Sequence, residues 1–531
     1  WILLLASLIG GCSGAINSPQ PDANDAGEDG GLQDGDPIDT GDDGDAGSAD
    51  PGPGDEIDGG SDPGADQLDG GSDPGADQPD GGEPGEVLAF PGVEGFGAQV
   101  SGGRGGQVIK VTTLDPTGPG SLDEALRTSG PRIVVFTVSG VINGDFDITE
   151  PDITIAGQTA PGAGITIVGR LWAPFSEIDG TSRVQNIIIR HVRVRHICRP
   201  GIPDNQCDTL RLSSQSRFVL DHLSLSWGID ETLDMWGGSH EWTIQDCTFE
   251  HPCRDSDGSP NHAYGMLNRR GGRGSLLRTA MINCRDRNPA FADGPFEIFN
   301  MVVYNHQTGL THHNPASGPF NVIGNYYRWG PAGGIGKPFW IGGSQNSETE
   351  PSYWFFDNYL DDDEADPFGR FDDPWTADHY LLGEDGMGGV AITHRATTRA
   401  DYSGFPEWVP PTLMSSTNTY DHVLLRAGAF PRDIVTRNAI AEVRDRTGEI
   451  GCPIRLLLDE QGNPSGPHPL MDGLTPTSPP TDSDDDGMPD DWETAHNLDP
   501  GDGNDHDTLM PNGYTAIENY INELAEQLVP R

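Results

Sequence analysis

Residues 186–195 read NIIIRHVRVR, and the same kind of phrase returns as FVLDHLSLSW at 218–227 and as WTIQDCTFEH at 242–251. Each phrase is a short run of apolar or β-branched residues with an Asn or Asp nearby and a turn after it. From residue 187 onward, corresponding phrases begin about 20–34 residues apart, with no long helical pattern between them. This spacing is typical of a solenoid, in which each rung buries its apolar face only against its neighbours.

A parallel β-helix, which is an all-β fold, accounts for this spacing better than a β-sandwich does. A sandwich requires adjacent hairpins with tight Asn-Gly or Asp-Gly turns, whereas the connections here are longer and uneven. A helical pattern at 433–446 is predicted to pack on the solenoid or to cap it. Four asparagines at similar points of the phrase are predicted to stack as a ladder inside the turns: Asn186, Asn300, Asn325 and Asn358.

The negative charge of the chain is concentrated in two flanking segments. The formal net charge of −52 argues against a protein that binds nucleic acid duplexes. Residues 13–86 hold 22 acidic residues and no Lys or Arg, and they include an eleven-residue repeat. With little to bury and strong self-repulsion, this segment is predicted to be a disordered tether. The predicted organisation is a leader at 1–12, the tether at 13–86, the solenoid at 87–473, a linker at 474–481 and a C-terminal module at 482–531.

The N-terminal end indicates export. Residues 1–11, WILLLASLIGG, form an apolar run that is too short to span a bilayer. Together with Cys12, the end of this run resembles a bacterial lipobox, which predicts lipidation of Cys12 and a membrane anchor. An ordinary secretory signal is the alternative. We therefore expect either a cell-surface (outer-membrane) lipoprotein or a secreted protein, and in both cases a monomer.

Six further cysteines follow Cys12 in the sequence. No CxxC pair among them predicts a zinc site or a redox centre. In an exported protein an even number of cysteines allows disulfides. Two short loops are plausible, Cys198–Cys207 and Cys247–Cys253, although the spacing alone does not fix the pairing.

Three separated parts of the chain carry a family resemblance. Residues 89–106 read AFPGVEGFGAQVSGGRGG and precede VTTLDPTGPGSLDEAL at 111–126, while VLDHLSLSWGIDETLDM lies at 219–235 and NCRDRNP at 283–289. In this order they resemble the opening, the metal-site strand and the catalytic arginine segment of the pectate lyases of polysaccharide lyase family 1. The resemblance implies a right-handed parallel β-helix. It also implies calcium-dependent β-eliminative cleavage of polygalacturonate, a (1→4)-α-D-galacturonan, to unsaturated oligogalacturonides.

Elimination across a uronate ring requires a cation on the carboxylate and a base for the weakly acidic C5 proton. By resemblance, Asp208, Asp230 and Asp234 are the calcium ligands, and Glu231 is a candidate helper. Many relatives carry a further ligand two residues before the position of Asp208, where this chain has Gln206. Taken without the resemblance, the acidic pair 230 and 234 could also be a solvated turn of the solenoid.

The same resemblance makes Arg287 the candidate general base. The pKa of an arginine lies above about 12, so this role requires help from nearby cations and from desolvation. The alternative is an ion-pair arginine with Asp286 or Asp293 as its partner. The family pattern Arg-x-Pro-x-x-Arg ends here in Ala292, and the family's substrate-binding lysine is not evident at 259–267. The residues that could replace these groups are His262, Arg269, Arg270 and Arg273.

The C-terminal segment carries the most specific local motif. Residues 482–493, DSDDDGMPDDWE, match the twelve-residue EF-hand loop. The predicted calcium ligands are Asp482, Asp484, Asp486, Met488 through its carbonyl, Asp490 and Glu493. A second half-site at 502–507 has poor spacing. We interpret the segment as a calcium-stapled mini-domain because few apolar residues remain to fold it, with calcium sensing or partner docking as the alternative.

The sequence thus predicts a surface-anchored, calcium-dependent lyase of de-esterified pectin. The missing second arginine and lysine suggest an alternative of another class, a polysaccharide-binding β-helix without catalysis. A lyase that acts on a related uronate polymer or on methyl-esterified pectin is a further alternative. Hydrolysis of the same polymer would require a pair of carboxylates flanking the bond, such as Asp230 and Asp234.

Overall fold

A computed structural model describes residues 87–173, 184–255, 262–332, 337–340, 351–361, 369–371 and 395–531. The chain divides into two units, Trp1–Pro79 and Asp80–Arg531, and every described residue belongs to the second. The predicted leader at 1–12, its lipidation site Cys12 and the predicted tether at 13–86 lie outside the described residues. No helix in the described part of the chain is both long and apolar enough to cross a membrane.

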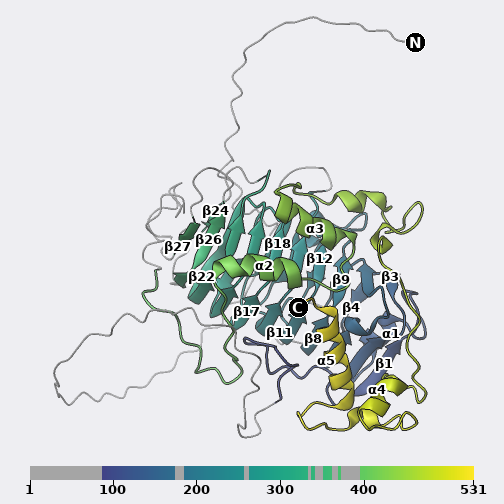
Figure 1. Ribbon diagram of the computed structural model, residues 1–531. Helices are drawn as coiled ribbons and strands as arrows, with labels where there is room; N and C mark the ends of the chain where they lie inside the picture. The colour runs from purple at the N-terminus through teal and green to yellow at the C-terminus, as the bar shows by residue number, and fades with distance from the viewer. Residues whose placement is uncertain are drawn as a thin grey trace, which may run out of the picture. The chain divides into compact units, whose positions relative to one another are not determined.

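The body is a parallel β-helix whose coils stack strands on three faces (Figure 1). The first face holds β1 (Gln107–Val111), β2 (Arg132–Phe136), β5 (Ile153–Ala156), β8 (Gln185–Arg190), β11 (Ser216–Asp221), β14 (His240–Gln245), β17 (Gly274–Leu277), β20 (Phe296–Phe299), the end of β22 (Thr308–Ile323) and β25 (Pro351–Phe356). The second face holds β3 (Gly140–Asn143), β6 (Ile165–Val168), β9 (Val192–Arg195), β12 (Ser224–Ser226), β15 (Thr248–Glu250), β18 (Ala280–Ile282), β21 (Val302–Tyr304), β23 (Tyr326–Arg328), β26 (Asn358–Asp361) and β27 (Gly369–Phe371). The third face holds β4 (Phe146–Asp147), β7 (Leu171–Trp172), β10 (Leu210–Arg211), β13 (Glu231–Met235), β16 (Tyr264–Asn268), β19 (Ala290–Asp293), the start of β22 and β24 (Lys337–Trp340).

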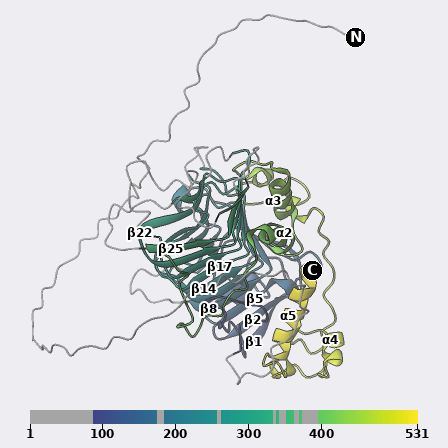
Figure 2. The same ribbon diagram turned by 60° about the vertical axis from the view of Figure 1, so that its left-hand side comes forward.

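Apart from β27, which pairs antiparallel with β26, neighbouring strands stack in parallel (Figure 2), and their register places each residue over its counterpart in the next coil. On the first face, Phe218 of β11 pairs with Ile187 of β8 and with Trp242 of β14. All three side chains are fully buried in the interior. The interior is therefore a set of apolar columns, which explains the apolar runs of the sequence and confirms the predicted parallel β-helix.

The predicted asparagine ladder is only half present. Asn325 donates to the side chain of Asn358 at 2.9 Å, as expected of a ladder. Asn300 instead turns outward with a φ of 56° and donates to the carbonyl of Met414. Asn186, with a φ of 62°, binds the N-terminal segment by accepting from the backbone N–H of Gly102 at 3.0 Å. The prediction is wrong for these two residues because they occupy left-handed corner positions rather than interior ones.

Two helices cover the outer side of the second face (Figure 1). The helix predicted at 433–446 is present as α3 (Ile434–Asp445), with Asp433 as its N-cap. Together with α2 (Ser416–Arg426), it buries apolar side chains against β18 and β21. This packing confirms that the predicted helix lies on the solenoid. A short helix near the start of the body, α1 (Leu122–Arg127), packs beside β1 and β4.

Two disulfides are present, and one of them matches the expectation. Cys198 is bonded to Cys207. Cys253 is bonded to Cys452, across 199 residues, rather than to Cys247. The expected Cys247–Cys253 loop is wrong because the Cys247 thiol is buried among the apolar columns of the interior, whereas Cys253 packs in an outer cluster beside its partner.

The C-terminal segment is docked on the first face of the solenoid. Its helices are α4 (Asp490–Ala495) and α5 (Ala516–Leu528), and α5 begins with a capping box of Thr515 and Glu518. Ile517 and Ile521 of α5 share a hydrophobic core with β2 and β5. An ion pair between Arg104 and Glu518 at 2.7 Å flanks this core. The segment therefore shares its hydrophobic core with the β-helix.

This shared core predicts that Ile517→Ala destabilises the protein by about 2–5 kcal/mol, because it removes fully buried methyl and methylene groups. The free energy of unfolding, measured by denaturant titration, is the test. The control is Leu509→Ala, since Leu509 is 71% exposed and its truncation should cost no more than about 0.5 kcal/mol. Equal effects of the two substitutions would contradict the docking.

Candidate active site and calcium sites

The predicted site residues meet on the third face, although they are far apart in the sequence. Asp208 lies just before β10, Asp230 just before β13, and Arg287 just before β19. The register places Glu231 beside Tyr264, and Tyr264 beside Asp286 of the following coil. In-register stacking thus brings residues from four successive coils, those of β10, β13, β16 and β19, to one place on the surface of the solenoid.

Three carboxylates form the centre of this site. Oxygen atoms of Asp208, Asp230 and Glu231 lie within 4.8 Å of one another, close enough to share one metal ion. Asp234 lies three residues beyond Glu231 in β13 and accepts a hydrogen bond from the hydroxyl of Ser213 at 2.7 Å. The three predicted ligands therefore gather, but Glu231, predicted only as a helper, is closer to the centre than Asp234.

Burial and mutual repulsion make this cluster costly to ionise. Burial, followed by repulsion from Asp208, raises the pKa of Asp230 to about 7. Burial also raises the pKa of Asp208 and of Glu231 well above their usual range, and the neighbouring carboxylates add to the effect. Such a set of oxygen donors matches what calcium prefers, and a divalent cation would remove the repulsion.

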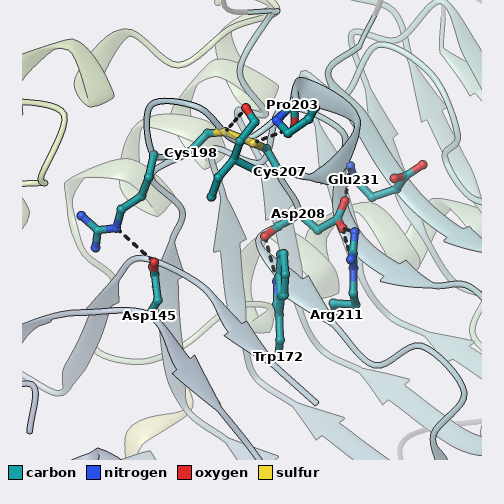
Figure 3. Close-up of a disulfide and its surroundings, with 10 residues drawn as sticks. Asp145, Trp172, Cys198, Pro203, Cys207, Asp208, Arg211 and Glu231 are labelled. Carbon is teal, nitrogen blue, oxygen red and sulfur yellow. Dashed lines mark hydrogen bonds and ion pairs between the residues drawn. A yellow bond between two sulfur atoms is a disulfide. The ribbon is translucent and has the colours of Figure 1, made fainter. Parts of the chain in front are cut away.

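Arg211 lies within this cluster and was not predicted. Its guanidinium pairs with Asp208 and, through Nε, lies 3.1 Å from Asp234. It also stacks over the Trp172 ring, 4.3 Å from the ring centroid (Figure 3). The pairing register of β10 and β13 would have identified Arg211 as a site residue, since Arg211 pairs with Asp234. Deriving this register requires knowing where each coil begins and ends, which the sequence does not give.

Asp208 is held in place from three sides (Figure 3). Its neighbour Cys207 is tied to Cys198 by a disulfide. Its carboxylate accepts from the backbone N–H of Glu231 at 3.0 Å, and its carbonyl accepts from the Trp172 indole at 3.2 Å. Gln206, at the position of the family's fourth ligand, is exposed at the end of a short 3-10 helix, Asp204–Gln206.

Arg287 reaches the cluster by pairing with Glu231. It also lies over the Tyr264 ring, 4.1 Å from the centroid. Burial alone would lower the pKa of Arg287, but the attraction of Glu231, with smaller contributions from Tyr264 and Asp230, raises it overall. The partners considered from the sequence are wrong, because Asp286 pairs with Arg285 and Asp293 accepts from Ser317.

The other candidate substrate-binding residues lie at different places relative to the carboxylates. His262 is beside the cluster, with its Nε2 3.9 Å from Asp230, and its Nδ1 contacts Asp255. Arg269 stacks on Trp236, 3.5 Å from the centroid of that ring. Arg270 is exposed at the turn after β16, and Arg273 is engaged by Glu241 and Glu407, so these two arginines do not reach the carboxylates.

The C-terminal loop gathers two overlapping sets of acidic oxygens within 4.8 Å. One set is Asp482, Asp484 and Asp486, and the other is Asp486, Glu493 and Asp505. Both carboxylate oxygens of Glu493, a fully buried residue, lack a hydrogen-bond partner among the described residues. These orphaned acceptors fit a calcium ion in the loop.

Two details of this loop differ from the EF-hand expectation. Asp505, placed by the sequence in a second and poorly spaced half-site, folds back within the short helix Asp505–Asp507 to join the first loop. Asp490 instead accepts from the backbone and the hydroxyl of Ser483, both at 2.7 Å. Met488 is buried, and its N–H donates to Asp486 at 2.8 Å.

Comparison with known proteins gives one consistent set of relatives. Probable pectate lyase C of Aspergillus terreus is 34% identical over 445 residues, which cover 82% of this chain and 94% of that protein. Probable pectate lyase C of Aspergillus fumigatus (strain CBS 144.89) is 34% identical over 448 residues, with the same coverage. No protein-family model matches the chain. Among solved structures, the thermostable pectate lyase PL 47 aligns with a TM-score of 0.43 at 15% identity, covering 66% of this chain and 99% of that one.

The two carboxylate clusters predict two separable calcium sites. Asp208→Asn should weaken one site by about tenfold or more, and Glu493→Gln should weaken the other, because each removes a charged oxygen ligand. Arg211→Gln should tighten the first site, because the guanidinium competes with the cation for Asp208 and Asp234. Isothermal titration with calcium measures all three variants. A single class of sites, or weaker binding in Arg211→Gln, would contradict this assignment.

The loop also predicts a pH dependence of stability. Burial and the neighbouring carboxylates raise the pKa of Glu493 to about 8, from an ordinary value of 4.5. Between these values the folded state retains a proton that the unfolded chain releases. The calcium-free protein should therefore lose stability as the pH rises through that window.

Melting temperatures in EGTA and in calcium, measured at pH 5 and pH 8, test this dependence. Calcium should raise the melting temperature more at pH 8, and Glu493→Gln should reduce the difference between the two pH values. The same calcium effect at both pH values would refute the account.

Proposed function

The chain belongs to the pectate lyase family, and from this premise we propose that it cleaves (1→4)-α-D-galacturonan by calcium-dependent β-elimination. The observation that carries the proposal is the meeting of Arg287 with the carboxylates Asp208, Asp230 and Glu231 on one face of the solenoid. The products would be unsaturated oligogalacturonides.

A calcium ion held by Asp208, Asp230 and Asp234 would neutralise the uronate carboxylate and so acidify its C5 proton. Arg287 takes that proton as the general base. The C–H electron pair forms the C4–C5 double bond, the bond from C4 to the glycosidic oxygen breaks, and this oxygen receives a proton from solvent. No hydrolytic water is consumed, which separates this chemistry from that of a glycosidase.

The environment of Arg287 explains why a cation would be required. Without one, the charges of Glu231 and Asp230 raise the pKa of Arg287, which opposes a role as base. Neutralising these carboxylates removes that obstacle and leaves burial, which lowers an arginine pKa, as the dominant influence. Glu231 would then release the guanidinium, which could approach the substrate.

Arg211 is proposed to supply part of the cationic surface that the family's second arginine and lysine provide. Ala292 occupies the position of that arginine and is fully buried, so it cannot contact a substrate. Arg211 already lies against Asp208 and Asp234 and stacks on Trp172. His262, beside Asp230, is the second candidate for binding a uronate carboxylate.

We assign the remaining segments as follows. Residues 87–473 form the catalytic solenoid, and residues 482–531 form a calcium-stapled module with Asp482, Asp484, Asp486 and Glu493 among its ligands. Met488 and Asp490 complete the EF-hand pattern of the sequence. Residues 1–12 direct export, with Cys12 as the lipid-anchor site and 13–86 as the tether. The protein would work as a monomer at the cell surface or after secretion.

The direct test of the base is Arg287→Lys, which keeps the charge but changes the reach and the planar geometry. Turnover on polygalacturonate, followed by the ultraviolet absorbance of the unsaturated product, should fall by about a hundredfold or more. Substrate affinity should change far less. The matched control is Arg273→Lys, since Arg273 is also ion-paired but lies away from the carboxylates.

The same assay separates the alternatives. Retention of more than about a tenth of wild-type turnover would remove Arg287 from the catalytic role. Reducing ends without ultraviolet absorbance would indicate hydrolysis. Binding without any product from the wild-type protein would indicate a non-catalytic β-helix. Faster reaction on methyl-esterified pectin or on another uronate polymer would change the substrate assignment.

A further inference from the structure

A second cluster of titratable side chains lies at a different corner of the solenoid, between its first and second faces. His191 follows β8 and His222 follows β11, each as the single left-handed residue that turns the chain, with φ values of 54° and 52°. The two imidazoles stack, with ring centroids 4.8 Å apart and planes 13° apart. The candidate active site, in contrast, lies on the third face.

These histidines are buried without the partners that an imidazole needs. His191 is fully buried, and neither of its ring nitrogens has a hydrogen-bond partner among the described residues. His222 is 8% exposed, and its Nε2 likewise lacks a partner within the described part of the chain. Buried polar atoms are rarely left unsatisfied, so three orphaned nitrogens at one corner point to a ligand.

Asp221 completes the cluster and is itself well positioned. Its Oδ2 accepts from Nε of Arg190 at 2.8 Å, and its Oδ1 accepts from Nε2 of Gln245 at 2.9 Å. His222 Nδ1 lies 3.0 Å from the same Oδ1. At this separation Oδ1 of Asp221 and Nδ1 of His222 can both ligate one ion, which would take the place of the proton between them.

We propose that His191, Asp221 and His222 bind a divalent transition-metal cation of the zinc class. One ligand atom from each residue lies within 4.8 Å of the others, which is the spread expected around a single ion. Two nitrogens and one oxygen suit zinc, cobalt or nickel, whereas calcium selects oxygen donors. The site is therefore chemically distinct from both calcium clusters.

The surroundings favour a cation over an anion at this position. Arg190 is already engaged by Asp221 and by the side chain of Asn522 of α5, at 2.8 Å each. Arg278 is held by Asp246 at 3.0 Å and by Glu94 at 2.5 Å. Neither arginine is thus left to attract an anion.

The cluster opens to a cavity of about 720 Å³ between the solenoid and the C-terminal module. The module contributes Asn519 and Asn522 to the lining, and the N-terminal segment contributes Phe90. Three protein ligands beside such a cavity leave space for a water molecule as a fourth ligand. Arg190 connects Asp221 to Asn522 of α5, so the cluster is linked by hydrogen bonds to the module.

The test uses the full chain, stripped of metal with a chelator and then titrated with Co²⁺. We expect one equivalent of Co²⁺ with the visible absorption of a nitrogen-ligated site, displaced by Zn²⁺ and unaffected by excess calcium. His191→Asn and His222→Asn should abolish this signal. Asparagine tolerates the left-handed conformation, as Asn300 does at the equivalent corner, so these variants should fold. The control is His422→Asn, because His422 lines the same cavity outside the cluster.

The wild-type titration decides the question even if a variant fails to fold. No cobalt absorption and no zinc retained by the wild-type protein would overturn the proposal and leave the histidines as a structural stack. The same signal in folded His191→Asn and His222→Asn proteins would also overturn it. Loss of the signal in His422→Asn alone would place the metal elsewhere in the cavity and refute this ligand set.

Discussion

Parallel, in-register stacking of successive coils is the constraint on which the rest of this structure depends. Because each residue lies over its counterpart in the next coil, columns of apolar side chains fill the interior, as Ile187, Phe218 and Trp242 do. The same stacking forces polar columns onto the outside. Asp234 must lie beside Arg211, and Glu231 beside Tyr264, whatever their separation in the sequence. The interior packing and the candidate active site are thus two consequences of one register.

Concentrated buried charge is the second recurrent feature. On the third face, arginines at 211 and 287 compensate part of the charge of a carboxylate cluster. In the C-terminal loop, Glu493 has no cation beside it among the described residues, so its need for a metal is greater. This contrast suggests different roles for calcium. At the first site the cation would serve catalysis, whereas at the second it would hold together a module that is packed on β2 and β5.

The sequence was sufficient for features that repeat and insufficient for those that depend on loop length. The spaced apolar runs predicted the β-helix, and the helical pattern at 433–446 predicted α3. In contrast, Arg211 was missed as a site residue and Asp505 was placed in a separate half-site, because the neighbours of both are fixed by where the chain turns. The bond from Cys253 to Cys452 crosses 199 residues and was unpredictable for the same reason. The pattern of apolar residues predicts the strands of each coil, but the lengths of the connecting loops decide which side chains of different coils meet.

The central claim is that the third-face cluster holds a cation and releases Arg287 for catalysis. A crystal structure with calcium and a galacturonate oligomer, with the ion located by anomalous scattering, tests it most directly. The account predicts an ion about 2.3–2.6 Å from oxygens of Asp208, Asp230 and Asp234, with Arg287 moved from Glu231 toward C5 of the bound sugar. Calcium found in the C-terminal loop alone, with Arg287 still paired to Glu231 beside a bound oligomer, would contradict it.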